Sequence, residues 1–257
     1  MNMKQKIKKI INKKNKSKII CLTAYSKNVA EAIDPYTDIV LIGDSLGSVL
    51  YNYKSTRNVT LHTMIEHSKS ARQGIKKSLM VVDMPYKTYK NKSEALRNAK
   101  TIIKQTKCDA VKLEGGSTIS KIIEHLVRNK IPVMGHLGIL PQSVKGKFKI
   151  KGKKTRERKK ILNDAKLLQK KGVFSIVLEC VEKTLSKEIT KILKIPTIGI
   201  GSSQYCDGQV LVIDDLIGLN ETKIKFVKKF GNIKKNISEA ACKFKKDVLS
   251  KKYPTKK

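Results

Sequence analysis

The chain has 257 residues and a formal net charge of +35, and it contains five scattered cysteines with no Cys-x-x-Cys spacing. No apolar run approaches the ~20 residues that span a bilayer and no signal-peptide pattern is present; the sequence therefore predicts a cytoplasmic protein without membrane contact, disulfide framework or zinc site. Only six of the 56 basic residues are arginine and the lysines are spread along the whole chain, which is typical of a solvated surface and predicts no specific nucleic-acid partner.

The first predicted element is an N-terminal helix within residues 1–17, where Ile7, Ile10 and Ile11 form one apolar stripe. We expect this helix to cover the bottom of the fold or to contact a neighbouring subunit. Short β-rich runs then alternate with lysine-rich segments of helical period. Strands are predicted at Lys18–Ala24, Ile39–Gly43, Leu79–Val82, Ala110–Leu113, Val133–Gly135, Phe174–Leu178, Thr197–Ile200 and Gln209–Ile213, and helices at Ser93–Lys107, Thr118–Asn129, Arg158–Lys171 and Leu185–Leu193.

Eight strands alternating with helices predict parallel crossovers that close into one (β/α)₈ barrel, a TIM barrel, over residues 1–257. An open doubly wound sheet is the structural alternative, but the chain has no Gly-x-Gly-x-x-Gly turn to support it. The run 145–160 after the fifth strand is almost entirely basic. Its composition predicts an exposed, mobile loop that could act as a lid, and a dedicated anion-binding role is the less favoured interpretation.

Carboxylates follow three consecutive predicted strands. Asp44 follows the second strand, Asp83 the third, and Glu114 the fourth. The chemistry of a barrel lies at the carboxyl ends of its strands, so we expect these groups to share one rim, where their mutual repulsion favours a bridging Mg²⁺. Each aspartate taken alone would more often cap the following helix; three acids on consecutive strands favour the metal.

Two further side chains close the next strands. His136 lies between Gly135 and Leu137 in a glycine-rich strand end, where ligand contact and a structural role are equally supported by spacing. Glu179 directly follows the sixth strand. A carboxylate at that position could remove a proton next to a metal-polarised carbonyl, and a salt bridge to lysine is the alternative.

A set of motifs in a fixed order resembles the ketopantoate hydroxymethyltransferase family between about Lys18 and Phe230. Single pieces would not be specific, but the ordered set is. The motifs are Leu22-Thr23-Ala24-Tyr25, Gly43-Asp44-Ser45-Leu46-Gly47, Asp83-Met84-Pro85-Tyr86, Val111-Lys112-Leu113-Glu114-Gly115-Gly116, Gly135-His136-Leu137-Gly138-Ile139-Leu140-Pro141-Gln142-Ser143, Leu178-Glu179-Cys180, Ile198-Gly199-Ile200-Gly201 and Cys206-Asp207-Gly208-Gln209-Val210-Leu211-Val212.

The resemblance implies a barrel of the phosphoenolpyruvate/pyruvate type that assembles as a homodecamer. It implies transfer of a one-carbon unit from 5,10-methylenetetrahydrofolate to 3-methyl-2-oxobutanoate, giving 2-dehydropantoate (ketopantoate) in pantothenate biosynthesis. The residues that bind the folate are not identified by the motifs. The closest rival is a Mg²⁺-dependent 2-oxo-acid lyase or aldolase on the same barrel, and the remote one is a basic nucleic-acid-binding protein.

Matching the family motifs residue by residue implies a role for each polar side chain. One Mg²⁺ per subunit would be held by Asp44 and Asp83, with Glu114 near it directly or through water. The 2-oxo acid would contact these aspartates together with Ser45, Lys112 and His136, and Glu179 would be the base that generates a Mg²⁺-stabilised enolate. Two positions depart from the family pattern: Ser26 stands where Asp is usual, and Asp214 stands where His is usual.

Overall fold

Eight parallel strands form a closed barrel in chain order, and β8 pairs with β1 to complete it. This confirms the predicted (β/α)₈ fold. The computed structural model describes residues 2–143, 149–221 and 224–255. The strands are β1 (Ile19–Thr23), β2 (Ile39–Ile42), β3 (Leu79–Asp83), β4 (Ala110–Glu114), β5 (Val133–Gly138), β6 (Ser175–Glu179), β7 (Thr197–Ile200) and β8 (Gly208–Leu211).

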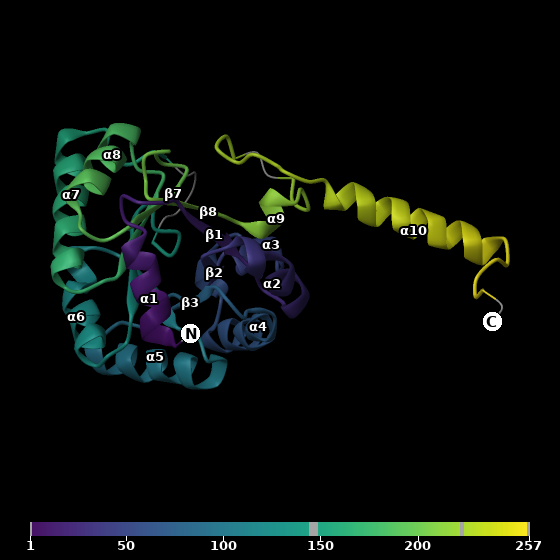
Figure 1. Ribbon diagram of the computed structural model, residues 1–257, viewed down its shortest axis with the longest axis horizontal. Helices are drawn as coiled ribbons and strands as arrows, with labels where there is room; N and C mark the ends of the chain where they lie inside the picture. The colour runs from purple at the N-terminus through teal and green to yellow at the C-terminus, as the bar shows by residue number, and fades with distance from the viewer. Residues whose placement is uncertain (1, 144–148, 222–223, 256–257) are drawn as a thin grey trace. The chain divides into compact units, whose positions relative to one another are not determined.

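Helices precede and separate the strands, and Figure 1 shows α5 to α8 wrapped around one side of the barrel. None of the described helices is long and apolar enough to cross a membrane. The helices are α1 (Met3–Asn12), α2 (Lys27–Ile33), α3 (Leu46–Val49), α4 (Leu61–Gly74), α5 (Lys92–Thr106), α6 (Ser120–Arg128), α7 (Thr155–Lys170), α8 (Lys183–Ile192), α9 (Ile213–Leu216) and α10 (Ile233–Leu249), with 3₁₀ turns at Asp34–Tyr36, Thr56–Asn58 and Ser117–Ile119.

Two compact units make up the chain, Met1–Leu211 with the barrel and Val212–Lys257 with α9 and α10, where the sequence predicted a single domain. The predicted basic loop 145–160 is also shorter than expected. Residues 145–148 lie outside the described residues, and α7 already begins at Thr155. The first turns of α7 carry no buried side chain before Ile161, so they lack the apolar period by which a helix is recognised in a sequence.

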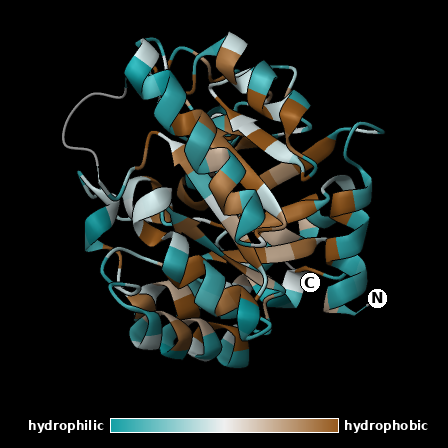
Figure 2. Cartoon of the chain, turned by 90° about the vertical axis from the view of Figure 1, so that its left-hand side faces the viewer, coloured by the Kyte–Doolittle hydropathy of each residue, from teal (hydrophilic) through white to brown (hydrophobic). Residues whose placement is uncertain are grey.

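Alternate side chains of the strands fill the barrel interior, as the two-residue period of a strand requires. The interior cluster takes Ile39 and Leu41 from β2, and Leu79 and Val81 from β3. Figure 2 shows the strands as predominantly hydrophobic and the surrounding helices as hydrophilic over much of their length. Among the lysines of the described segments, only Lys6 and Lys112 are buried, as expected for a charge carried by the solvated surface.

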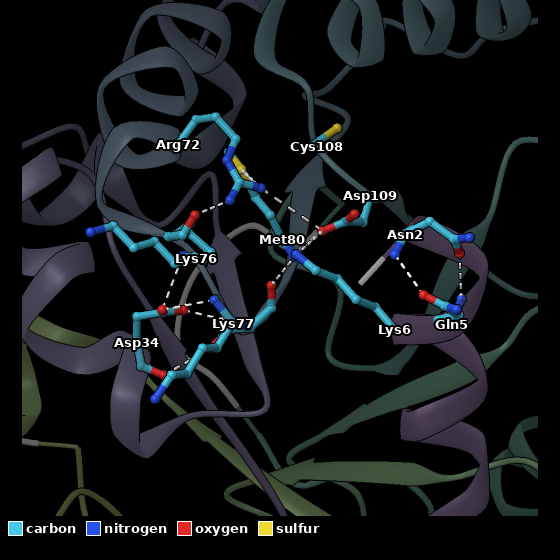
Figure 3. A network of polar contacts seen from close by, with 12 residues as sticks. Asn2, Gln5, Lys6, Asp34, Arg72, Lys76, Lys77, Met80, Cys108 and Asp109 are labelled. Atoms are coloured by element: carbon cyan, nitrogen blue, oxygen red, sulfur yellow. Dashed lines mark hydrogen bonds and ion pairs between the residues drawn. The ribbon is translucent and has the colours of Figure 1, made fainter.

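Helix α1 covers the bottom of the barrel, where the strands begin. Ile10 is 1% exposed and joins the interior cluster. On one side of it, Lys6 Nζ donates to the Ser78 carbonyl (2.8 Å) and lies 3.3 Å from Asp109 Oδ2, within the network that Figure 3 shows. On the other side, Lys14 Nζ forms a 2.8 Å ion pair with Asp207. These contacts hold α1 against the bottom of the barrel, one of the two positions expected for this helix.

A second bottom contact fixes the turn that leads into β3. Asp34 accepts hydrogen bonds from the backbone N–H groups of Lys76, Lys77 and Ser78, each at 2.9 Å, and two of these donors are labelled in Figure 3. Burial acts to raise the pKa of Asp34, but the three backbone donors outweigh it and hold the pKa below its usual value of 3.8. The ionised carboxylate is therefore the form that stabilises this turn.

Asp34→Asn is expected to lower the free energy of unfolding by about 1–3 kcal/mol at neutral pH, because an amide cannot accept all three bonds as a carboxylate does. A lowered folded-state pKa contributes stability above the unfolded value of 3.8 and loses it as the pH falls through the folded value. The difference between the two proteins should therefore shrink in acid, as measured by urea unfolding at several pH values. Glu31→Gln on α2 is the control, with little change expected; a gap that widens in acid would contradict the assignment.

Candidate active site

The polar side chains of the site lie at the strand positions that face the barrel interior, where every second residue of a strand points. In β3, Asp83 lies two residues beyond Val81, which belongs to the interior cluster. In β4, Lys112 and Glu114 continue the period that Ala110 begins. Because side chains two apart share a face, all three polar groups point into the barrel at the carboxyl ends of the strands. They stand directly above the apolar interior.

The next two strands repeat this arrangement. His136 lies two residues beyond the interior Met134 in β5, and Glu179 two beyond Val177 in β6. The strand register places Asp83 opposite Lys112 and Glu114 opposite His136. Four consecutive strands thus deliver a continuous band of charged side chains to one rim, which is where the chemistry of a barrel lies.

The side chains of this band are in contact with one another. Lys112 Nζ lies 3.1 Å from Asp83 Oδ1 and 3.2 Å from His136 Nδ1. His136 lies between two acids, with Nδ1 3.5 Å from Glu114 Oε1 and Nε2 3.1 Å from Glu179 Oε2. Glu179 has the most exposed side chain of these five, at 16%, whereas the others are at most 6% exposed. It therefore stands at the solvent side of an otherwise buried cluster.

Asp44 joins this cluster from the turn after β2. Its backbone N–H donates to Asp83 Oδ2 at 3.0 Å, and its own Oδ2 accepts from Gln142 Nε2 at 2.8 Å. The helix N-caps nearby are other residues, Ser45 for α3 and Asn91 for α5. Neither aspartate performs the helix-capping role that was its alternative interpretation, and both carboxylates face the shared site.

Burial and mutual repulsion set the charge state of the carboxyl groups. Burial raises the pKa of Asp44 well above its usual range, and the charges of Asp83 and Glu114 raise it further. Burial also raises the pKa of Asp83, against the attraction of Lys112. Burial has the same tendency at Glu114, but the contact with His136 holds the pKa of that group below its usual value. Asp44 is therefore the acid that most needs a further cation in order to ionise.

The two basic groups are held in their charged forms. Burial acts to lower the pKa of Lys112, but the surrounding carboxylates, Asp83 first among them, raise it. Burial and Lys112 likewise act to lower the pKa of His136, but Glu114 and Glu179 outweigh them and raise it to about 9. Two cations then face four carboxyl groups. If all four carboxyl groups ionise, the negative charge left over is the amount that one divalent cation balances.

The donor atoms at this rim fit a magnesium ion. Asp83 Oδ1 and Glu114 Oε1 are buried and, despite their ion-pair contacts, accept no well-aligned hydrogen bond from the described residues. Hard carboxylate oxygens are the ligands that Mg²⁺ prefers, and Mg²⁺ keeps several waters while binding one or two carboxylates. No three acidic, cysteine or histidine side chains of the described chain form a complete ligand set. The fit is therefore to one or two direct carboxylates, with water as the other ligands and as a hydrogen-bond donor to an acid that does not bind the ion directly.

Backbone geometry shapes the rim beside Glu179. Gly138 has a φ of +101°, and a Cβ there would lie 2.1 Å from the Glu179 carbonyl oxygen, so only glycine is accommodated. Cys180 also adopts a left-handed φ of +49° directly after Glu179, a conformation that a non-glycine residue holds only where its surroundings enforce it.

On the other side of the site, Ser45 Oγ lies 2.8 Å from the Tyr25 hydroxyl.

The structure thus brings together the side chains of Asp44, Asp83, Lys112, Glu114, His136 and Glu179. Glu179 contacts a histidine where the alternative was a lysine. The sequence reasoning missed Gln142, Tyr89 and Arg57, which connect the site to its surrounding loops. Gln142 was visible within a family motif, but nothing in the sequence gave it a partner.

Of the two departures from the family pattern, Ser26 is the N-cap of α2 and makes no side-chain capping bond. Asp214 is a buried residue of α9 in the second unit. Burial raises its pKa, and its Oδ2 has no hydrogen-bond partner among the described residues.

Comparison with known proteins bears on the family and the fold. The model of the family described as ketopantoate hydroxymethyltransferase matches residues 4–256. A 3-methyl-2-oxobutanoate hydroxymethyltransferase of Pelagibacter ubique (strain HTCC1062) is 66% identical over 255 residues, with 99% of both chains covered. One of the same name from Rhizobium etli is 45% identical over 240 residues, covering 92% of this chain and 88% of the relative.

Solved structures at far lower identity share the barrel. A 2,3-dimethylmalate lyase, described as a PEP mutase/isocitrate lyase superfamily member, has a TM-score of 0.65 at 10% identity, with 100% of this chain and 91% of that chain covered. A phosphonopyruvate hydrolase in complex with oxalate and Mg²⁺ has a TM-score of 0.63 at 10% identity, covering 97% and 88%. These similarities concern the fold alone. The sequence matches confirm the resemblance carried by the motifs, and the chain belongs to the ketopantoate hydroxymethyltransferase family.

Proposed function

We propose that this protein is a 3-methyl-2-oxobutanoate hydroxymethyltransferase that uses Mg²⁺ and 5,10-methylenetetrahydrofolate. The observation that carries the proposal is the band of charged side chains at one rim of the barrel, in a chain 66% identical to a protein of that name. In the reaction, a C–H bond at C3 of the 2-oxo acid is broken and C3 forms a new bond to the folate's methylene carbon. Water supplies the hydroxyl oxygen, and tetrahydrofolate leaves.

Asp44 and Asp83 would hold the Mg²⁺, and Glu114 would face it through water. The bound ion would polarise the keto carbonyl and offset negative charge at its oxygen. The buried Lys112 ammonium, fixed by its 3.1 Å contact with Asp83, adds a second positive charge beside that oxygen. Ser45 would contact the substrate from the opposite side, with its hydroxyl oriented by Tyr25.

Glu179 would remove the proton from C3. His136 Nε2 contacts its Oε2 at 3.1 Å, and a proton on Nε2 can face Glu179 whether or not the imidazole carries a second proton on Nδ1. Oε2 is paired with His136 by this ion-pair contact, which is not an aligned hydrogen bond, and we therefore assign Oε1 to the substrate. His136 then orients the base and separates its charge from the Glu114 carboxylate, which keeps the two acids from repelling one another directly.

The wider context of the proposal follows the family. We propose that the enzyme acts in pantothenate biosynthesis in the cytoplasm, as a homodecamer with one Mg²⁺ per subunit. The assembly state is measurable by sedimentation or light scattering of the purified protein.

The proposed reaction predicts strict dependence on all three components. Purified protein should form ketopantoate from 3-methyl-2-oxobutanoate only when 5,10-methylenetetrahydrofolate and Mg²⁺ are both present, because the folate supplies the carbon and the metal activates the keto acid. Product is measured by chromatography and mass spectrometry against omission controls. Cleavage or condensation of 2-oxo acids without folate would contradict the proposal and identify a lyase or aldolase on this barrel.

A further inference from the structure

One buried side chain contacts the site without a part in the proposed reaction. Gln142 lies in the loop after β5, four residues beyond Gly138, and is 2% exposed. Its backbone N–H donates to Glu114 Oε2 at 3.0 Å, and its Nε2 donates to Asp44 Oδ2 at 2.8 Å and to the Met84 carbonyl at 3.0 Å. A single residue therefore joins carboxylates that come from the ends of β2 and β4.

Gln142 is itself fixed from two sides. The Tyr89 hydroxyl donates to its Oε1 at 2.5 Å. Arg57 Nε donates to its carbonyl at 2.7 Å, and the same guanidinium reaches the Ser143 carbonyl at 3.2 Å. On the other side of the amide, Asp44 Oδ2 and the Met84 carbonyl are both acceptors. A flipped amide would turn its own oxygen toward them, so Nε2 must face Asp44. The orientation of the amide is set by this network.

A neutral amide is suited to this position. Asp44 and Glu114 repel one another, and burial strengthens that repulsion. A lysine in place of Gln142 would reduce the repulsion by neutralising the charge of one carboxylate. Its own positive charge, however, would repel a cation bound between Asp44 and Glu114. An amide donates hydrogen bonds to the carboxylates without adding charge, so it can fix their orientation and leave their negative charge available.

We propose that Gln142 is a positioning residue that holds Asp44 and Glu114 in the arrangement in which they receive the divalent cation, with Tyr89 fixing its amide. This inference rests on the proposed function, which assigns these carboxylates to Mg²⁺. The role is exerted through the two acids and not on the substrate. It therefore affects the affinity for the metal before it affects any chemical step.

The test is titration of Mg²⁺ alone into the full-length protein by calorimetry. Gln142→Met keeps the length of the side chain and the backbone N–H to Glu114 but removes the amide, and the Kd for Mg²⁺ is expected to rise about 10- to 100-fold. Tyr89→Phe removes only the hydroxyl and should raise the Kd by a smaller factor. In turnover assays, the Mg²⁺ concentration for half-maximal rate should rise by the same factors, and the rate should recover at saturating Mg²⁺.

The matched control is Thr190→Val at the opposite end of the barrel. Thr190 is buried, and its hydroxyl hydrogen-bonds the Ser186 carbonyl and Thr197, both at 2.7 Å. This variant should lower the melting temperature and leave the Kd for Mg²⁺ unchanged. If Gln142→Met melts earlier yet binds Mg²⁺ with unaltered affinity, the residue is structural only and the proposal is overturned.

Two further outcomes separate the inference from the function on which it rests. Should Gln142→Met fail to fold, Tyr89→Phe decides the matter, and an unchanged Kd in that variant overturns the proposal. If the unaltered protein binds Mg²⁺ and the variants bind it more weakly, but no ketopantoate is formed, the positioning role stands and the proposed function falls. If the unaltered protein does not bind Mg²⁺, the ligand assignment and this inference both fail.

Discussion

Glu179→Gln is expected to slow Mg²⁺-dependent exchange of the C3 proton of 3-methyl-2-oxobutanoate by about 10²- to 10⁴-fold, the range that a general base contributes. The amide is nearly isosteric, keeps a contact for His136 and cannot accept the proton. Exchange is followed by NMR in deuterated water without folate, so only proton removal is observed. Binding of the 2-oxo acid should be retained, because Glu179 lies at the solvent side of the cluster and outside the proposed metal ligands.

Glu182→Gln is the matched control for this substitution. Glu182 lies three residues further along the chain and caps α8 through bonds to the N–H groups of Thr184 and Leu185. The same change of carboxylate to amide there should cost some stability and leave exchange at the unaltered rate. If Glu179→Gln exchanges the C3 proton as fast as the unaltered protein, Glu179 is not the base.

Asp83→Asn is expected to reduce kcat/KM by about 10³-fold and to raise the Kd for Mg²⁺ strongly, because a Lewis acid supplies several kcal/mol of charge stabilisation in the transition state. The substitution removes a proposed ligand and the principal partner of Lys112 at once. Metal affinity is measured by calorimetry, and activity by ketopantoate formation over a series of Mg²⁺ concentrations. Chelation of the unaltered protein should abolish turnover, and added Mg²⁺ should restore it.

Asp109→Asn supplies the control at the other end of the barrel. Asp109 is also a buried aspartate paired with a lysine, at 3.3 Å from Lys6, and it accepts the Met80 N–H at 2.9 Å. Its replacement should destabilise the protein and leave the affinity for Mg²⁺ unaltered. Turnover that persists in the presence of chelator, or unchanged Mg²⁺ binding by Asp83→Asn, would contradict the assignment of the metal site.

Much of the barrel and part of the site could be predicted because both follow from local patterns. Apolar runs closed by polar residues gave all eight strands, and β7 was predicted with its observed bounds, Thr197–Ile200. The same period of two carries Leu79 and Val81 into Asp83, and Ala110 into Lys112 and Glu114. A strand that is apolar on its inner face and ends in an acid directs that acid into the barrel mouth.

The remaining features depend on contacts between segments that lie far apart in the sequence. Gln142 forms hydrogen bonds with Asp44, 98 residues earlier, and with Tyr89, 53 residues earlier, and its proposed role depends on both. No local sequence pattern shows that these three distant residues come into contact. The predicted start of α7, Arg158, lies beyond the observed start at Thr155. The first turns of this helix face solvent and carry no apolar residue before Ile161, so no apolar pattern marks where it begins.

The N-terminal segment contacts residues that are synthesised near the end of the barrel, and this affects how the protein folds during synthesis. Strand β1 pairs with β8, and Lys14 meets Asp207, 193 residues away. During translation, one edge of β1 therefore stays open until almost the whole barrel has left the ribosome. Long-range pairing of this kind is slow and leaves the nascent chain exposed to aggregation. Closure of the ring therefore comes late in synthesis, once β8 has emerged, and chaperones are suited to protect the open barrel until then.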